Sequence, residues 1–282
     1  MKYGMNVLLW IDHLDDSILP VLESLKAMGY DGVEVPLFQL DEAHSQSWGK
    51  RLDDFGLERT AVTVRTAEDN PISPNAKIRA AGVAANKRTI DCCHALGVQV
   101  LCGPFHSAIG EFSGAGPTAD EWKWGVESMR EVAEYAEQAN VVLAPEAVNR
   151  FECYLANCMV DLSRFVTEVD HPSCKLLYDT FHANIEEKDP VQAIRTCAPH
   201  VGLVHISEND RSTPGQGNVC WDETFDTLRE IGYDGWLVVE AFGLCLPRIA
   251  AATKIWRSMF ESEEQLAREA LDFMRSNVAR RW

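Results

Sequence analysis

Leu25-Lys-Ala-Met-Gly-Tyr-Asp-Gly-Val-Glu-Val35 recurs near the other end of the chain as Leu228-Arg-Glu-Ile-Gly-Tyr-Asp-Gly-Trp-Leu-Val238. Each copy places a glycine just after a helical pattern, where a left-handed turn would end the helix, and then enters a short apolar run. Leu52–Glu58 and Ala95–Gln99 are weaker versions of the same pattern. Such repeats are typical of the helix-to-strand connections in a chain built from successive strand–helix units.

The same alternation of short apolar runs and longer helical patterns extends along the whole chain. The apolar runs are not interrupted by alternating polar residues, which favours a parallel sheet buried on both faces. A doubly wound sheet is the alternative, but no G-x-G-x-x-G follows the first strand. With 282 residues, close to the roughly 250 of a typical barrel, we predict an α/β fold, a single (β/α)8 TIM barrel domain over residues 1–282.

The predicted strands are Met5–Trp10, Gly32–Pro36, Thr60–Val64, Val98–Cys102, Val141–Glu146, Lys175–Tyr178, Val201–Ile206 and Gly235–Glu240. The predicted helices are Ser17–Met28, Asp41–Phe55, Ile78–Leu96, Ala119–Gln138, Leu155–Val169, Pro190–Cys197, Trp221–Ile231 and Glu263–Val278.

The net charge of −17 restricts the partners of the protein. A surface this acidic repels nucleic acid and anionic lipid, so we expect neither nucleic acid nor membrane as a partner. A neutral small molecule would not be repelled, and a divalent cation would be attracted. There is no N-terminal leader pattern and no apolar run of about 18 residues. Nine cysteines without a C-x-x-C pair fit buried thiols in a reducing compartment, so we expect a cytoplasmic protein.

Four consecutive predicted strands each carry a metal-ligand type of residue at or near their carboxyl ends. These residues are Glu146, Asp179, His205 and Glu240. Active sites of barrels lie on this face, so the four side chains should meet at one rim. Any one of them alone is more often a structural group, but one per strand on four strands favours a site. Three carboxylates and one imidazole suit Mn²⁺, Mg²⁺ or Co²⁺ better than the thiolate-rich sites of structural zinc.

Further polar residues follow these strands. Glu152 lies in the loop after the fifth strand, and His182 lies just beyond the sixth. A polar segment after the seventh strand carries Arg211, and its Pro214-Gly215 and Gly217 predict turns rather than helix or strand. From the pattern alone, this loop is equally well explained as solvated surface.

Several of these segments resemble the ketose 3-epimerase family, the group of D-tagatose, D-psicose (allulose) and L-ribulose 3-epimerases. The resemblance is carried by Val148-Asn-Arg-Phe-Glu152, Leu177-Tyr-Asp-Thr-Phe-His-Ala-Asn-Ile-Glu-Glu187, Glu208-Asn-Asp-Arg-Ser-Thr-Pro-Gly-Gln-Gly217 and Val239-Glu-Ala-Phe242. It extends over nearly the whole chain, and the first two motifs are specific.

The resemblance implies a metal-dependent ketose 3-epimerase that interconverts C3 epimers of a free ketohexose or ketopentose through an enediolate. It implies Glu146, Asp179, His205 and Glu240 as ligands of one divalent metal, Mn²⁺ before Co²⁺ or Mg²⁺. Glu146 and Glu240 would be the catalytic acid/base pair. Substrate binding would fall to Glu152, His182 and Arg211, and the assembly would be a homodimer or homotetramer.

The sequence departs from this family at residues expected near the far end of the sugar. Asn6 stands where an aromatic residue is usual, and Ala108-Ile109-Gly110 follows His106-Ser107 where many members have tryptophan. Asp210 and Ala241 are also unusual. Because the metal and acid/base residues are intact, we expect the reaction to be kept and the substrate to differ.

Three alternatives remain open. An aldose–ketose isomerase would use a similar metal barrel but move hydrogen between C1 and C2. An endonuclease of a related barrel would need more histidine ligands and a basic face, which eight histidines and a charge of −17 disfavour. A non-catalytic sugar-binding barrel would tolerate the loss of one catalytic glutamate.

Two tryptophans give weaker indications. Trp10, at the end of the first predicted strand, is equally well explained as a wall of the pocket or as a core residue. Trp256 is a candidate interface residue.

Overall fold

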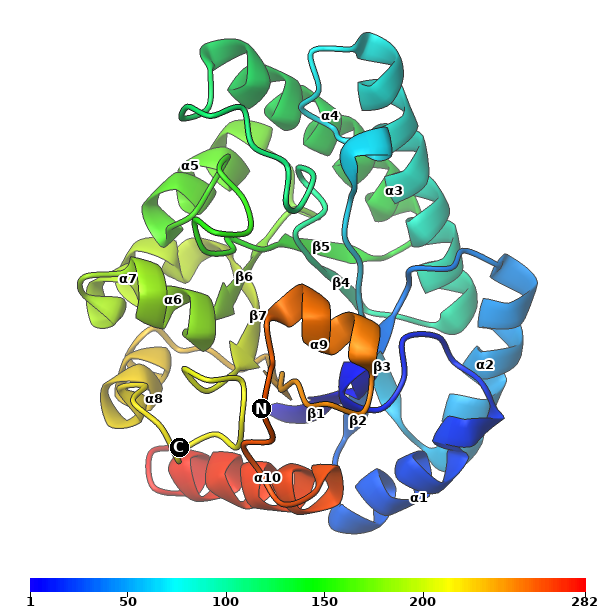
Figure 1. The fold of residues 1–282 in the computed structure, drawn as a ribbon, viewed down its shortest axis with the longest axis vertical. Helices are drawn as coiled ribbons and strands as arrows, with labels where there is room; N and C mark the ends of the chain where they lie inside the picture. Colours follow the sequence, from blue (N-terminus) through cyan, green and yellow to red (C-terminus); the bar gives the residue numbers. More distant parts are fainter.

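The computed structural model describes residues 1–282 as eight parallel strands in a nearly closed barrel with helices around it (Figure 1). The strands are hydrogen-bonded in the order β5-β4-β3-β2-β1-β8-β7-β6. They are β1 (Lys2–Asn6), β2 (Gly32–Pro36), β3 (Glu58–Val62), β4 (Val100–Gly103), β5 (Val142–Pro145), β6 (Leu176–Asp179), β7 (Val201–Ile206) and β8 (Trp236–Val239). The predicted single-domain TIM barrel is confirmed as a fold.

The helices include one for each strand and two short additional ones. They are α1 (Leu19–Met28), α2 (Glu42–Phe55), α3 (Ala76–Leu96), α4 (Ala119–Gln138), α5 (Met159–Val169), α6 (Thr180–Glu186), α7 (Pro190–Cys197), α8 (Trp221–Glu230), α9 (Pro247–Thr253) and α10 (Glu263–Ala279). Four short 3₁₀ segments complete the set: η1 (Val7–Leu9), η2 (Asp16–Ile18), η3 (Ala67–Asp69) and η4 (Ala198–His200).

The repeated helix-to-strand connection has the expected conformation. Gly29 caps α1 with φ +100°, and Gly232 follows α8 with φ +70°. Both angles lie in the left-handed region that residues with a side chain rarely adopt. The chain then turns directly into β2 and β8, so the two copies of the repeat build equivalent corners of the barrel.

The structure corrects the bounds of the first and third strands and of one helix. The third strand, predicted over Thr60–Val64, is β3 at Glu58–Val62. The strand predicted over Met5–Trp10 is β1 at Lys2–Asn6, and Val7–Leu9 is a 3₁₀ turn. The Asn6 side chain accepts a hydrogen bond from the Leu8 backbone and caps that turn, so an apolar run was mistaken for a strand. The helix predicted from Leu155 begins at Met159. α6 and α9 were not predicted.

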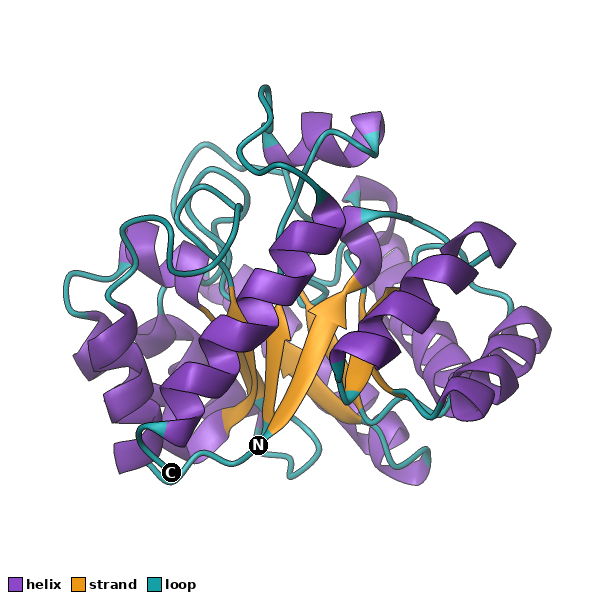
Figure 2. Ribbon diagram, turned by 90° about the horizontal axis from the view of Figure 1, so that it is seen from below, coloured by secondary structure: helices purple, strands orange, loops and turns teal.

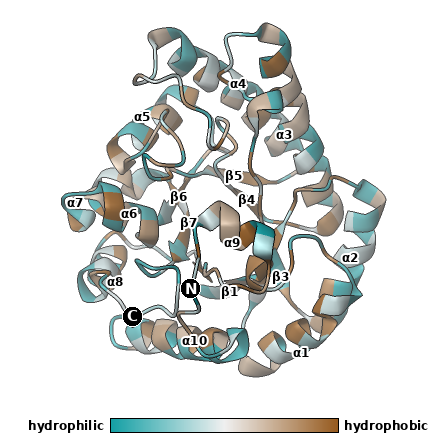
Figure 3. Cartoon of the chain, viewed as in Figure 1, coloured by the Kyte–Doolittle hydropathy of each residue, from teal (hydrophilic) through white to brown (hydrophobic).

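The apolar core has two parts. A large cluster packs the outer faces of the strands against the helices, and a small one that includes Val62, Cys102, Leu203 and Val238 fills the barrel. Because side chains alternate along a strand, every second residue points inward. Figure 3 shows that the surrounding helices carry both hydrophilic and hydrophobic residues, as expected for helices with one face on a barrel.

The barrel has one weak join, between β5 and β6. All other neighbouring strands pair through ladders, and only the β6–β7 ladder has a register shift, between Leu176 and Leu177. β5 meets the β6 segment only through the isolated bridges Leu143 to Cys174 and Glu146 to Leu177. This join lies directly below the carboxyl ends of the two strands that carry Glu146 and Asp179.

The long loops gather at one end of the barrel, and both termini lie at the other (Figure 2). α9 sits over the centre of the barrel in the axial view (Figure 1), with one buried side chain, Ala250. It therefore partly covers the end at which the strands deliver their last residues. None of the helices is long and apolar enough to cross a membrane.

Candidate active site

Four side chains from four neighbouring strands converge at the loop end of the barrel. Glu146, Asp179, His205 and Glu240 are all buried, and one ligand atom from each lies within 4.8 Å of those of the others. The Asp179 carboxylate also caps α6 by accepting hydrogen bonds from the backbone N–H groups of Phe181 (2.6 Å) and His182 (3.1 Å). This cap fixes the orientation of the second carboxylate oxygen, which lies 3.3 Å from His205 Nδ1.

Two ligand atoms in this cluster lack any hydrogen-bond partner in the protein. They are Glu146 Oε1 and His205 Nδ1, both buried. Buried polar atoms are normally satisfied, because an unpaired one loses the hydrogen bonds it made in water. Oxygen and imidazole atoms that converge and remain unpaired fit a divalent cation, so these four residues can hold one.

Glu34 on β2 is a site residue that the sequence analysis missed. It is completely buried inside the barrel, and its Oε1 lies 2.9 Å from His205 Nε2. Its carboxylate also accepts hydrogen bonds from Asn6 (2.9 Å), Thr60 (2.9 Å) and Cys102 (3.0 Å). With Nε2–H donating to Glu34, the lone pair of His205 Nδ1 faces the cation site. The available sequence signal was that Glu34 is the one acidic residue within the apolar run of the repeat.

Asn6 links this buried carboxylate to the site. Its side-chain amide donates to Glu34 Oε1 at 2.9 Å and lies 3.5 Å from Glu240 Oε1. The aromatic residue usual at this position could not make these contacts. The other departures lie in loops after the strands. Ala108 and Ala241 are buried, Gly110 donates its N–H to the Glu152 carbonyl (2.7 Å), and Asp210 accepts from the backbone of Ser212 (3.0 Å).

Arg211 supplies positive charge next to the carboxylates. Its Nη1 lies 2.5 Å from Glu240 Oε2 and 3.4 Å from Asp179 Oδ2, and the side chain is buried. The guanidinium stacks 3.6 Å from the centre of the Phe181 ring. The backbone φ of Arg211 is +64°, a left-handed conformation that is rare for a residue with a side chain. The surrounding loop must therefore hold this conformation.

Glu208 organises that loop. It is completely buried, and its two oxygens accept from the backbone N–H groups of Asn209 (3.0 Å), Gly215 (2.8 Å) and Val219 (3.1 Å) and from the Trp221 indole (2.9 Å). One carboxylate thus ties both ends of the loop to α8. The predicted turn-rich segment is confirmed as a loop, but its buried residues rule out the alternative of simple solvated surface.

His182 and Glu152 meet the cavity from the β5 and β6 side. The backbone N–H of Asn149 donates to His182 Nδ1 (3.0 Å), so the neutral ring carries its proton on Nε2. His182 Nε2 lies 3.4 Å from Glu146 Oε1 and 3.0 Å from Arg211 Nη2. Glu152 is half-buried and accepts from the Asn149 amide (2.7 Å). The three predicted substrate-binding residues therefore face one space.

The environment moves the pKa values of these groups apart. Burial, and then the negative charges of Glu240 and Asp179, raise the pKa of Glu146 well above its usual range. Burial alone would raise the pKa of Asp179, but the Arg211 cation holds it below its usual range. Burial and the Arg211 charge lower the pKa of His182, which keeps the ring neutral.

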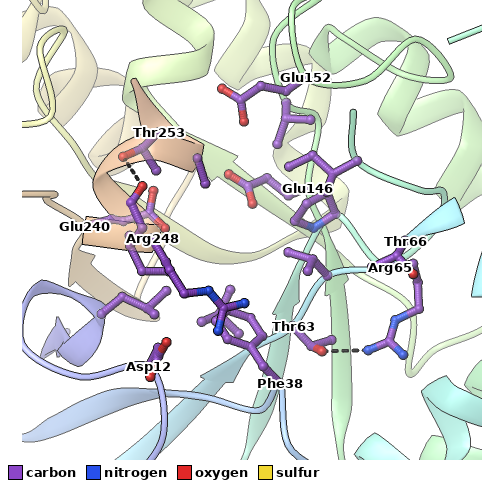
Figure 4. A pocket seen from close by; sticks show the side chains of 18 of the residues that line it. Asp12, Phe38, Thr63, Arg65, Thr66, Glu146, Glu152, Glu240, Arg248 and Thr253 are labelled. Carbon is purple, nitrogen blue, oxygen red and sulfur yellow. Dashed lines mark hydrogen bonds between the residues drawn. The ribbon is translucent and has the colours of Figure 1, made fainter. Parts of the chain in front are cut away.

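The cluster opens into a cavity of about 590 Å³ under α9. Figure 4 shows Glu146, Glu152 and Glu240 on one side of it, with Asp12, Phe38, Thr63 and Arg65 toward the other. Trp10 does not line this cavity. It lies half-buried beside Pro20, Val21 and Leu25 of the α1 region and packs against the core, so of the two alternatives for Trp10 the core position holds and the pocket wall does not.

Comparison with known proteins identifies the family. The family model described as xylose isomerase-like TIM barrel matches residues 22–277. The D-psicose 3-epimerase of Ruminiclostridium cellulolyticum is 32% identical over 98% of this chain and 97% of its own, and that of Agrobacterium fabrum is 31% identical over 98% of both. The crystal structure of D-allulose 3-epimerase from Methylomonas sp. with D-allulose superposes with a TM-score of 0.92, at 27% identity over 98% of this chain and 97% of that one. The chain is thus an enzyme of the isomerase class and belongs to the ketose 3-epimerase family of xylose isomerase-like TIM barrels.

Proposed function

We propose that the protein is a metal-dependent ketose 3-epimerase that interconverts the C3 epimers of a ketohexose or ketopentose. The observation that carries this proposal is the pairing of two buried glutamates, Glu146 and Glu240, around a cation site with unpaired ligand atoms. Epimerisation at one carbon requires a proton to leave from one face and return to the other. A carboxylate from β5 and another from β8 supply one group for each face.

The proton at C3 of a ketose is too weakly acidic for a carboxylate alone. A bound divalent cation would polarise the C2 carbonyl and so make this proton more acidic. One glutamate then takes the proton from C3, and the other returns a proton to the opposite face of the resulting enediolate. Which of Glu146 and Glu240 acts first depends on the configuration of the substrate. Each is expected to contribute roughly 10²–10⁴-fold to the rate as a general acid or base.

His182, Arg211 and Glu152 would bind the oxygens at the C1–C3 end of the sugar. His182 Nε2–H and Arg211 Nη2 are both donors, and they lie 3.0 Å apart. A substrate oxygen next to the pair would accept from both. Glu152 can accept a hydrogen bond from a sugar hydroxyl on the same side. Arg211→Ala should therefore raise KM for the ketose while the protein remains folded.

Mn²⁺ is the proposed metal, with Co²⁺ and Mg²⁺ as alternatives of similar ligand preference. A cytoplasmic location is supported by nine free cysteines, most of them buried. A homodimer or homotetramer is proposed from the resemblance, and Trp256, whose side chain is 71% exposed, is a candidate interface residue.

The decisive experiment is proton NMR of a ketose panel after reaction in D₂O. Metal-stripped and Mn²⁺-loaded protein would be incubated with tagatose, fructose, psicose, sorbose, ribulose and xylulose, and the metal chelated before spectra are recorded. Deuterium at C3 together with a C3 epimer, only in the loaded samples, is expected. Deuterium at C1 with aldose formation would instead identify an isomerase. No exchange in any sugar despite bound metal would contradict the proposal.

Glu240→Gln tests the acid/base assignment. The amide cannot exchange the proton, so turnover should fall by at least the factor expected of a general base, and further if metal binding weakens. Glu127→Gln, on the exposed side of α4, is a matched control that should leave turnover unchanged. A Glu240→Gln protein that keeps both its metal and near-wild-type turnover would exclude Glu240 from the chemistry.

A further inference from the structure

The cavity is larger than a free ketose requires. A ketohexose has twelve non-hydrogen atoms and would fill roughly a third of the 590 Å³ at ordinary packing density. The C1–C3 end is assigned to the cation site by the proposed function, on which this inference rests. The remainder of the cavity lies toward β1, β2 and β3, where Phe38, Thr63 and Arg65 form the opposite wall (Figure 4).

This far wall contains a buried arginine held in place by its neighbours. The Arg65 side chain is 5% exposed, donates to Thr63 Oγ1 (2.6 Å), and forms an ion pair with Asp69 (3.0 Å). Its Nε is buried and has no hydrogen-bond partner. Burial, and to a smaller extent repulsion by the Arg88 cation, lower the pKa of Arg65. The charges of Arg65 and Arg88 therefore act on the same region.

Two further arginines of this cavity have no carboxylate partner. Arg65 and Arg211 are ion-paired with Asp69 and Glu240, whereas Arg88 on α3 and Arg248 on α9 line the cavity as solvent-exposed side chains in no ion pair. Figure 4 shows Arg248 extending from α9 into the cavity, toward Phe38 and Asp12. An arginine that extends into a cavity without a partner presents its donors to whatever binds there.

The balance of charge on the far wall is positive in an acidic protein. Arg65, Arg88 and Arg248 outnumber Asp12 and Asp69, although the whole chain has a net charge of −17. The opposite end of the cavity holds Glu146, Glu152 and Glu240. A ligand that spans the cavity therefore meets carboxylates and a cation site at one end and arginines at the other.

We propose that the substrate is an acidic ketose, whose carboxylate or phosphate lies at the end of the chain remote from C3 and is bound by Arg248 and Arg88 beside Arg65. Guanidinium groups bind either anion through paired donors. Arg248 comes from the short helix after β8, the region where many barrels bind phosphate, whereas Arg65 and Arg88 come from the β3 loop and from α3. Ile109 lines the same cavity, in the segment where many members of the family have tryptophan.

The test compares three ketoses that are identical from C1 to C5: fructose, fructuronate and fructose 6-phosphate. Mn²⁺-loaded full-length protein is assayed for kcat/KM of C3 epimerisation, and binding of each ketose is measured by calorimetry. At least one anionic ketose should exceed fructose about 10-fold in kcat/KM and in affinity. The comparison of fructuronate with fructose 6-phosphate distinguishes carboxylate from phosphate.

A variant tests the role of Arg248. Arg248→Met should lower the ratio of kcat/KM for the anionic ketose to kcat/KM for fructose 10-fold or more. The control Arg229→Met, which replaces an exposed arginine of α8, should leave this ratio unchanged.

The outcomes separate this inference from the proposed function. Turnover of fructose without preference for either anion would overturn the inference and leave the epimerase intact. Tighter binding of an anionic ketose without turnover of any ketose would support the inference and overturn the proposed reaction. An Arg248→Met protein that loses activity equally on neutral and anionic ketoses would show that Arg248 acts only structurally.

Discussion

At the scale of single residues, the Glu34 carboxylate determines which nitrogen of His205 faces the cation site. Glu34→Gln keeps the shape but removes the charge that favours a proton on Nε2. Partners of this kind typically affect metal affinity 10- to 100-fold, so we expect Mn²⁺ to bind the variant about 10-fold more weakly. Calorimetric titration of the metal-free protein measures this directly. Thr60→Val, which removes one donor to Glu34, should weaken Mn²⁺ binding less. Equal Mn²⁺ affinity in Glu34→Gln and wild type would refute this role of Glu34.

A second residue-scale prediction concerns His106, which is buried with neither ring nitrogen hydrogen-bonded. Burial lowers its pKa to about 4. The unfolded chain binds a proton near pH 6.5 and the folded chain does not, so stability is lost as pH falls from about 6.5 toward 4. Between pH 7.5 and 5 this amounts to about 2 kcal/mol. Urea unfolding of metal-free protein at both pH values should show a smaller loss in His106→Leu, and parallel losses would contradict the prediction.

At the scale of elements, the loop between β7 and α8 depends on Glu208. Glu208→Ala leaves three backbone donors and one indole donor without their acceptor, each at a cost of about 1–3 kcal/mol if it stays buried. We expect the loop to open rather than bear this cost, which releases Arg211 from its left-handed conformation. Limited proteolysis should cut the variant within residues 209–219, and KM should rise. Asp210→Ala, in the same loop, is the control, and an uncut Glu208→Ala loop would disprove the clamp.

The elements also show what the sequence could and could not predict. Strands such as β2 and β7 and helices such as α4 were predicted to the residue, because apolar runs and capping residues mark both ends. α9 has only seven residues, buries only Ala250 and packs Ile249 partly against the core, so it is too short for periodicity to reveal it. The four candidate ligands follow from strand ends, which are local signals. The roles of Glu34 and of the arginines on the far wall of the cavity depend on which strands and loops meet across the barrel. Local sequence patterns do not contain this information.

At the scale of the whole molecule, the candidate cation site spans the weak join between β5 and β6. Glu146 follows one strand and Asp179 ends the other, so a cation bound to both ties them together. Metal at 100 times its Kd should raise the free energy of unfolding by about 2.7 kcal/mol, provided that the unfolded chain does not bind it. Thermal unfolding with Mn²⁺ and with EDTA measures the shift. Hydrogen exchange should slow most in β5 and β6, and an unchanged Tm would show that no such tie exists.

The position of α9 bears on how this enzyme can change over evolutionary time. The helix contributes Arg248 to the cavity and only Ala250, with the partly buried Ile249, to the core, and it connects two loops at the surface. Insertions, deletions and substitutions are tolerated best in such segments. Duplicated copies of the gene could therefore acquire new substrates by altering these seven residues, while the strands continue to supply the same four candidate ligands.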